Sequence, residues 1–170
     1  MTTYIAFLRG INVGGNMLLP MAELKALCAD AGFEEVQTYI QSGNVILQSR
    51  LSGEPVRTRL QKVLFNAKGK EIAVAVRSAV ELESILSANP FSKANPSQVI
   101  VLLLNDPVQK ESLRDIKIPG KEEVKAGLRE LYIHYPEGMG KSKLKLPSVF
   151  KTGTARNLNT IAKLVELASS

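Results

Sequence analysis

A glycine-rich segment near the N-terminus has the residue types and spacing of an anion-binding loop. The apolar run Tyr4–Leu8 is followed by Arg-Gly-Ile-Asn-Val-Gly-Gly-Asn at positions 9–16, and Pro20 then opens a helical periodicity. Where a strand ends in a glycine turn before a helix, several free backbone N–H groups can point at one phosphate or carboxylate. The alternative is a turn whose glycines only let the backbone pack closely. The candidate ligand-binding residues of this segment are Arg9, Asn12, Gly14 and Gly15.

The same segment departs from the nucleotide-binding glycine motifs. Gly10 and Gly15 have the separation of the outer glycines in G-x-x-x-x-G-K-[ST], but Asn16-Met17 stands where that motif has Lys followed by Ser or Thr. The lysine of that motif reaches the β- and γ-phosphates, and its hydroxyl residue binds magnesium. The sequence therefore does not support a nucleotide triphosphatase, and the segment does not fit G-x-G-x-x-G either.

A second polar turn, Gln41-Ser42-Gly43-Asn44, separates two predicted strands. Ser, Gly and Asn are the residues that a tight turn favours, and this explanation is sufficient for them. The side chains can also read the hydrogen-bonding edge of a ligand. Gln41, Ser42 and Asn44 are therefore added to the candidate ligand-binding residues.

The third stretch, 132–144, contains the only histidine of the chain, His134. A single histidine excludes a metal site built from several histidines, and we predict neither a metal nor a cofactor. A lone histidine on a strand is more often structural than catalytic, but it is the candidate acid or base if the protein is an enzyme. Gly140-Lys141-Ser142 resembles half of a phosphate loop, although the glycine required upstream is absent. Lys141, Ser142 and Lys143 are candidate ligand contacts.

The fourth stretch, 152–160, precedes a predicted helix. Its Asn and Thr residues are typical of helix N-caps, which would account for Asn157. A cap does not account for Arg156, which would lie beside the positive end of the helix dipole. A bound anion would relieve that pairing, and Arg156 and Asn157 complete the candidate site.

The charge of the chain also favours an anionic partner. The formal net charge is +6, and segment 138–165 contains no acidic residue. Removing its six cations from the 22 basic residues leaves 16, equal to the 16 acidic residues of the chain. Such a segment suits a small anion, a polyanion or plain solvation. The six cations are Lys141, Lys143, Lys145, Lys151, Arg156 and Lys163.

The elements that must position these residues follow the order βαββαβ and then βαββα. This order predicts an α+β fold of two tandem ferredoxin-like halves, the second without its last strand. The predicted organisation is a first half at 1–77, a connecting helix and linker at 78–97, and a second half at 98–170. The strands are expected at 3–9, 35–41, 44–49, 71–77, 99–104, 121–126 and 129–135, and the helices at 20–31, 55–68, 79–88, 107–115 and 158–168.

Other features narrow the protein class. Cys28 is the only cysteine, so an internal disulfide and a cysteine-cluster metal site are excluded, and its helical spacing predicts a buried thiol. No apolar run approaches about 18 residues, so we expect a soluble, cytoplasmic protein with no membrane partner. The 5% aromatic content and the lack of Trp argue against nucleic-acid binding by base stacking.

These motifs together resemble those of an uncharacterised bacterial family, Domain of Unknown Function sixteen-ninety-seven. The resemblance runs over nearly the full length and implies an α+β fold with two related ferredoxin-like halves, but it implies no reaction. The family usually has Trp where this chain has Leu158, and a longer helix after the Ser-Lys-Leu motif. The motifs that carry it are Leu8–Gly15, Tyr39–Asn44, His134-Tyr135-Pro136 with Gly138 and Gly140, Ser142-Lys143-Leu144, and Arg156-Asn157 with Asn159-Thr160.

Three functions are open on the sequence alone. The first is binding of a small anionic ligand, with or without catalysis, between the two halves. Arg9, Asn12, His134, Lys143 and Arg156 would then converge on one cleft. The second is a nucleic-acid-associated module that binds weakly through charge. The third is a structural or oligomerising protein, which would leave the motif loops unexplained. No Ser-His-Asp set and no carboxylate pair at useful spacing is present, so no reaction is assigned.

Overall fold

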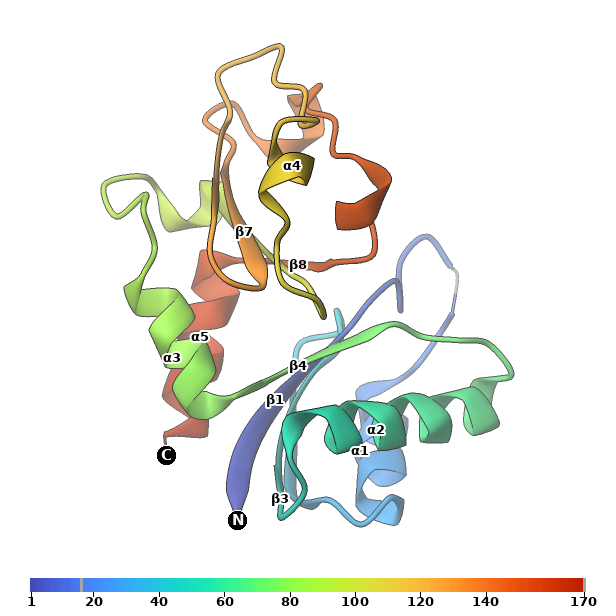
Figure 1. Ribbon diagram of the computed structural model, residues 1–170. Helices are drawn as coiled ribbons and strands as arrows, with labels where there is room; N and C mark the ends of the chain where they lie inside the picture. The colour runs from blue at the N-terminus through green and yellow to red at the C-terminus, as the bar shows by residue number, and fades with distance from the viewer. Residues whose placement is uncertain (16, 170) are drawn as a thin grey trace. The chain divides into compact units, whose positions relative to one another are not determined.

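The structure, a computed structural model, describes residues 1–15 and 17–169 and is of mixed α+β type (Figure 1). Within these residues it contains two four-stranded antiparallel sheets and five α-helices. The chain divides into two compact units, residues 1–83 with the C-terminal turns from Leu164 onward, and residues 84–163. Asn16, the last residue of the predicted glycine turn, lies outside the described residues.

The first unit has the sheet order β2-β3-β1-β4, with every neighbouring pair antiparallel. Its central strand β1 pairs with β3 on one side and with β4 on the other. The predicted elements of this half are confirmed with shifts of three residues or fewer at their ends. They are β1 (Thr2–Leu8), α1 (Met21–Asp30), β2 (Glu34–Tyr39), β3 (Asn44–Ser49), α2 (Gly53–Lys68) and β4 (Val74–Ser78), and α3 (Ala79–Ser87) follows.

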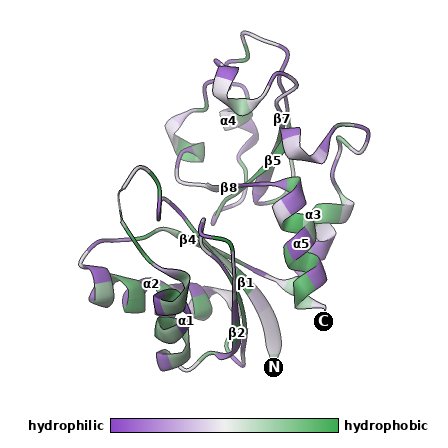
Figure 2. Cartoon of the chain, turned by 180° about the vertical axis from the view of Figure 1, so that it is seen from behind, coloured by the Kyte–Doolittle hydropathy of each residue, from purple (hydrophilic) through white to green (hydrophobic). Residues whose placement is uncertain are grey.

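The core of the first unit lies between its sheet and the helices α1 and α2. Alternate residues of β1 share one face, and Ala6 and Leu8 pack there with Leu24 of α1 and Leu60 of α2. Figure 2 shows hydrophobic and hydrophilic residues alternating along both helices, as one-sided burial requires. The predicted burial of Cys28 is confirmed, and desolvation raises the pKa of its thiol to about 12. The thiol therefore stays protonated and unreactive at neutral pH.

The second unit has the sheet order β6-β7-β5-β8. Residues Leu102, Leu131, Ile133 and Tyr135 project from one face of this sheet into a core that Phe150 completes. Its elements are η1 (Pro96–Gln98), β5 (Val99–Leu103), α4 (Lys110–Leu113), β6 (Glu123–Ala126), β7 (Glu130–His134), η2 (Met139–Lys141), η3 (Ser148–Phe150), β8 (Thr154–Asn157) and α5 (Leu158–Ala168).

The second half is not the predicted βαββα without a last strand. A fourth strand, β8, is present and pairs antiparallel with β5, and α5 comes after it. β8 has only four residues, Thr-Ala-Arg-Asn, without an apolar alternation, and its polar residues resemble a helix cap. Its pairing partner β5 is more than 50 positions earlier in the chain, so local pattern could not reveal it. The helix expected at 107–115 is the single turn α4.

Among the described residues, no helix has both the length and the apolar character that crossing a membrane requires.

Candidate functional site

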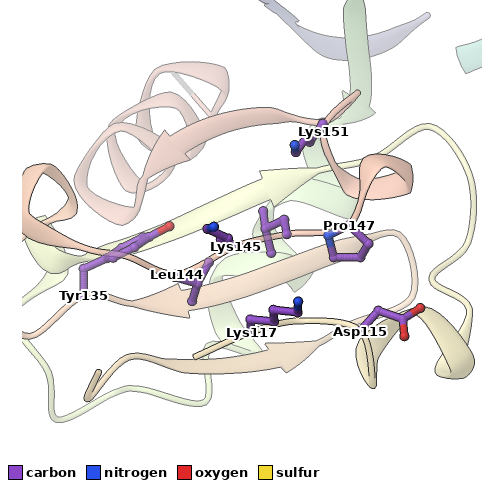
Figure 3. Close-up of a pocket in the computed structure, with 8 residues that line it drawn as sticks. Asp115, Lys117, Tyr135, Leu144, Lys145, Pro147 and Lys151 are labelled. Carbon is purple, nitrogen blue, oxygen red and sulfur yellow. The ribbon is translucent and has the colours of Figure 1, made fainter. Parts of the chain in front are cut away.

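An open groove of about 640 Å³ in the second unit brings together three lysines (Figure 3). Lys117, Lys145 and Lys151 line it with one acidic residue, Asp115. Among the described residues, no ion pair or side-chain hydrogen bond involves any of the three lysines. The remaining lining residues are Tyr135, Leu144, Leu146 and Pro147.

Two of these lysines are held directly opposite each other by the backbone. Lys117 and Lys145 form an isolated antiparallel bridge in which each backbone N–H donates to the other's carbonyl, both at 2.9 Å. Residues that exchange both hydrogen bonds in this way project their side chains on the same side. The bridge therefore starts two like-charged side chains from neighbouring positions on the same side, an arrangement that destabilises a strand pair.

We expect Lys145→Gln to stabilise the ligand-free protein slightly, by about 0.5 kcal/mol, because it removes this cross-strand repulsion. The free energy of unfolding, measured in urea at low ionic strength, should rise, and the gain should shrink in high salt. Lys143→Gln is the matched control, since Lys143 is exposed on the same segment but does not line the groove. Equal gains in the two variants would contradict a specific repulsion at the bridge.

Tyr135 presents a neutral hydroxyl at this groove. The residue is 7% exposed, and its ring packs in the core of the second unit. Burial, and secondarily the negative charge of Glu122, raises the pKa of Tyr135 above its usual range. Among the described residues, no hydrogen-bond partner of this hydroxyl is present. A hydroxyl that reaches solvent in a groove and has no protein partner can donate a hydrogen bond to a ligand.

The predicted residue Ser142 anchors the basic segment through hydrogen bonds of its hydroxyl group. Its Oγ donates to Glu122 Oε1 at 2.7 Å and accepts from the Leu144 backbone N–H at 3.1 Å. The hydrogen bond from Ser142 also lowers the pKa of Glu122. Ser142 thereby orients the segment from which Leu144 and Lys145 enter the groove. Lys141 and Lys143 are exposed on this segment and do not line the groove.

In the first unit, the predicted residue Asn12 joins two of the motif loops. Its Nδ2 donates to Leu19 O and to Gln41 O, both at 2.9 Å, and its Oδ1 accepts from Leu19 N–H at 2.8 Å. Asn12 has φ 55°, a left-handed conformation that Asn tolerates better than most residues. The side chain therefore closes segment 12–19 and ties it to the turn at Gln41.

The turn itself is held by Asn44, which is fully buried. Asn44 Nδ2 donates to Tyr39 O at 2.9 Å and to Ser42 Oγ at 3.1 Å. The structure thus brings four of the predicted residues together at one turn, in two hydrogen-bonded pairs. They are Asn12, Gln41, Ser42 and Asn44.

The remaining predicted residues of the first unit are at the surface. Gly14 and Gly15 have φ 59° and 78° and are exposed, and no heavy atom lies within 4 Å of the position a Cβ would take at either. Arg9 has an exposed side chain, and its backbone N–H donates to Ala73 O at 3.0 Å. The glycines are therefore required for backbone conformation, and their N–H groups lie on an accessible loop.

His134 and Arg156 lie on the other face of the second sheet from Tyr135. His134 ends β7 and Tyr135 follows it, so the two side chains lie on opposite faces. Val101 of β5 pairs with Tyr132 on one side and with Arg156 on the other, so Arg156 shares the face of Tyr132 and His134. The His134 ring contacts that of Phe91, with centroids 5.6 Å apart. Arg156 Nη1 donates to Ala155 O at 2.8 Å, and desolvation lowers its pKa to about 10, so it stays charged at neutral pH.

Asn157 has the predicted capping contact, because its Oδ1 accepts from Thr160 N–H at 2.9 Å at the start of α5.

A common cleft for Arg9, Asn12, His134, Lys143 and Arg156 stays a prediction. Among residues 1–15 and 17–169, no three side chains of His, Cys, Asp or Glu gather closely enough to hold a metal ion.

The sequence pattern did not predict the groove, because its two bridged lysines are distant in the chain. The basic run from 138 to 165 signalled Lys145 and Lys151, but nothing local connected them with Lys117 or Asp115. That connection depends on a bridge of two backbone hydrogen bonds between segments without strand periodicity.

Comparisons with known proteins agree with the α+β architecture. The family described as "Protein of unknown function (DUF1697)" matches residues 1–132. The solved structure of a conserved bacterial protein from Streptococcus pneumoniae is similar, with a TM-score of 0.81 at 21% sequence identity. The match covers 100% of this chain and 99% of that one, and at this identity it shows the fold alone. No curated protein matches the sequence.

Proposed function

We propose that this chain, which belongs to the DUF1697 family, binds a small anionic ligand in the lysine groove of its second unit. The observation that carries the proposal is the bridge that fixes Lys117 and Lys145 side by side, with Lys151 on the same groove. An anion between the ammonium groups replaces a repulsion with attractions and charge-assisted hydrogen bonds.

The groove also has the other features of a ligand site. It combines charged groups with the apolar side chains of Leu144, Leu146 and Pro147, and its volume falls in the range of small-molecule pockets. The Tyr135 hydroxyl adds a donor that the fold itself leaves unused. A solvated basic face requires no concave wall.

The architecture supports a second part of the proposal, that the two units are tandem ferredoxin-like halves. The sheet orders β2-β3-β1-β4 and β6-β7-β5-β8 have the same form, with the first strand of each unit paired to its third and fourth. In the second unit, η2 and η3 occupy the connection in which the first unit has α2. Most of the groove lining comes from that altered connection, and Asp115 and Lys117 come from the segment between α4 and β6.

The test is isothermal titration of the intact protein with inorganic phosphate and sulfate at constant ionic strength, with chloride as the reference salt. Lys117→Gln and Lys145→Gln should each weaken phosphate binding by roughly ten- to a hundredfold, because a charge-assisted hydrogen bond contributes roughly 1.5–3 kcal/mol. Lys143→Gln should leave the affinity unchanged.

Two results would overturn this proposal. One is binding of phosphate and sulfate that is no tighter than binding of chloride, the reference anion. The other is equal weakening by Lys143→Gln, which would indicate a diffuse field of the basic segment. Binding of nucleic acid that is lost in moderate salt would also be a property of that field, not of the groove.

A further inference from the structure

We infer that the anion is a phosphate monoester whose remaining part carries a hydroxyl group and an apolar face, the chemistry of a nucleoside monophosphate. This inference rests on the proposed anion binding and specifies the ligand of the same groove. It follows from the charge balance of the lining, from the position of its one acid and from its apolar walls.

The charges of the lining match a dianion. Three lysines and one aspartate give the groove a net charge of two positive units. A phosphate monoester carries about −1.5 to −2 charges at neutral pH and offers three acceptor oxygens. A carboxylate supplies one charge and two oxygens, so it would leave the Lys117–Lys145 repulsion only partly relieved. The balance therefore favours phosphate over carboxylate.

Asp115, the acidic residue that lines the groove, does not help to bind an anion. The Asp115 side chain is exposed, and no described residue forms an ion pair or hydrogen bond with its carboxylate. A carboxylate beside an anion site weakens the binding of a bare anion. An ionised carboxylate only accepts hydrogen bonds, so its natural partner on a ligand is a hydroxyl or amino group. Asp115 would thus distinguish a phosphorylated polyol from inorganic phosphate.

The two ends of the groove differ in the way such a ligand requires. Figure 3 shows Tyr135 at one end, Asp115 and Pro147 at the other, and Lys117 and Lys145 between them. A phosphate held by the lysines would have its hydroxyl-bearing part near Asp115. The apolar face of the ligand would lie against Leu144, Leu146 and Pro147. The neutral Tyr135 hydroxyl can donate to a phosphate oxygen at its own end.

The experiment is isothermal titration of the intact protein with four probes: adenosine monophosphate, inorganic phosphate, adenosine and acetate. We expect adenosine monophosphate to bind about tenfold more tightly than phosphate, and both to bind more tightly than acetate or adenosine. Asp115→Ala should strengthen phosphate binding a few-fold and weaken adenosine monophosphate binding about tenfold. These opposite changes are the signature of an acid that repels the anion and binds the hydroxyl.

Asp106→Ala is the matched control, because Asp106 is an exposed aspartate of the same unit outside the groove. It should change neither affinity. Asp115→Asn, which keeps an acceptor oxygen without the charge, should strengthen phosphate binding and cost adenosine monophosphate less than Asp115→Ala does. Circular dichroism of each variant establishes that it is folded.

The outcomes separate the two proposals. If acetate binds as tightly as phosphate, or if Asp115→Ala shifts both phosphate compounds in the same direction, the monoester inference is wrong while anion binding stands. If adenosine monophosphate and phosphate bind equally, the inference is wrong as well. If no probe binds the wild-type protein, the proposed function itself fails.

Discussion

Gly43→Ala is expected to destabilise the protein by about 4 kcal/mol, although a methyl group is the only addition. Gly43 has φ +93°, which strains any residue with a side chain by roughly 1–3 kcal/mol. A Cβ placed here would lie 2.6 Å from Ile11 Cδ1 and 3.0 Å from Leu8 Cβ. Ile11 is 1% exposed, so it has no free space to move into, and overpacking adds about 1–3 kcal/mol.

Gly69→Ala separates the two contributions. Gly69 ends α2 with φ +71°, and no heavy atom lies within 4 Å of the position a Cβ would take. Gly69→Ala should therefore lower the free energy of unfolding by only about 1 kcal/mol, the cost of the left-handed conformation for alanine. Urea unfolding of both variants measures the difference. Equal losses would show that the close approach of Leu8 and Ile11 contributes nothing.

This glycine illustrates how much the sequence could predict. The Ser-Gly pair between two apolar runs predicted a turn, and the strands 34–39 and 44–49 confirm it. What the pattern could not reveal is that the turn packs against Leu8, at the end of β1, and Ile11, in the loop that follows. Turn chemistry is local, whereas this packing depends on β1 lying beside β3.

The same division holds for the candidate site. Elements with strong periodicity, such as the helix now seen at Gly53–Lys68, were predicted to within two residues because apolar spacing alone fixes them. The strand β8 and the Lys117–Lys145 bridge have no such spacing, and both depend on pairing between distant segments. The basic segment was recognised from its charge. The groove in which its lysines meet Lys117 forms only through that pairing.

Asn12→Ala is expected to cost about 3–4 kcal/mol, an unusually large loss for a loop residue. The variant removes three hydrogen bonds, which join Asn12 to Leu19 and Gln41 and contribute about 1 kcal/mol each. It also places alanine at φ 55°, where asparagine is better tolerated, at a cost of about 1 kcal/mol. The free energy of unfolding, measured in urea, gives the total.

Asn12→Gly is the control, because it removes the same hydrogen bonds and adopts this φ without strain. It should be about 1 kcal/mol more stable than Asn12→Ala. Wild-type stability in either variant would mean that the side chain does not hold the loop. A large loss in both would make Asn12 the residue that fixes segment 12–19 against the Gln41 turn. The backbone amides of Gly14 and Gly15 would then belong to a preorganised loop, the condition under which such amides bind an anion without a further ordering cost.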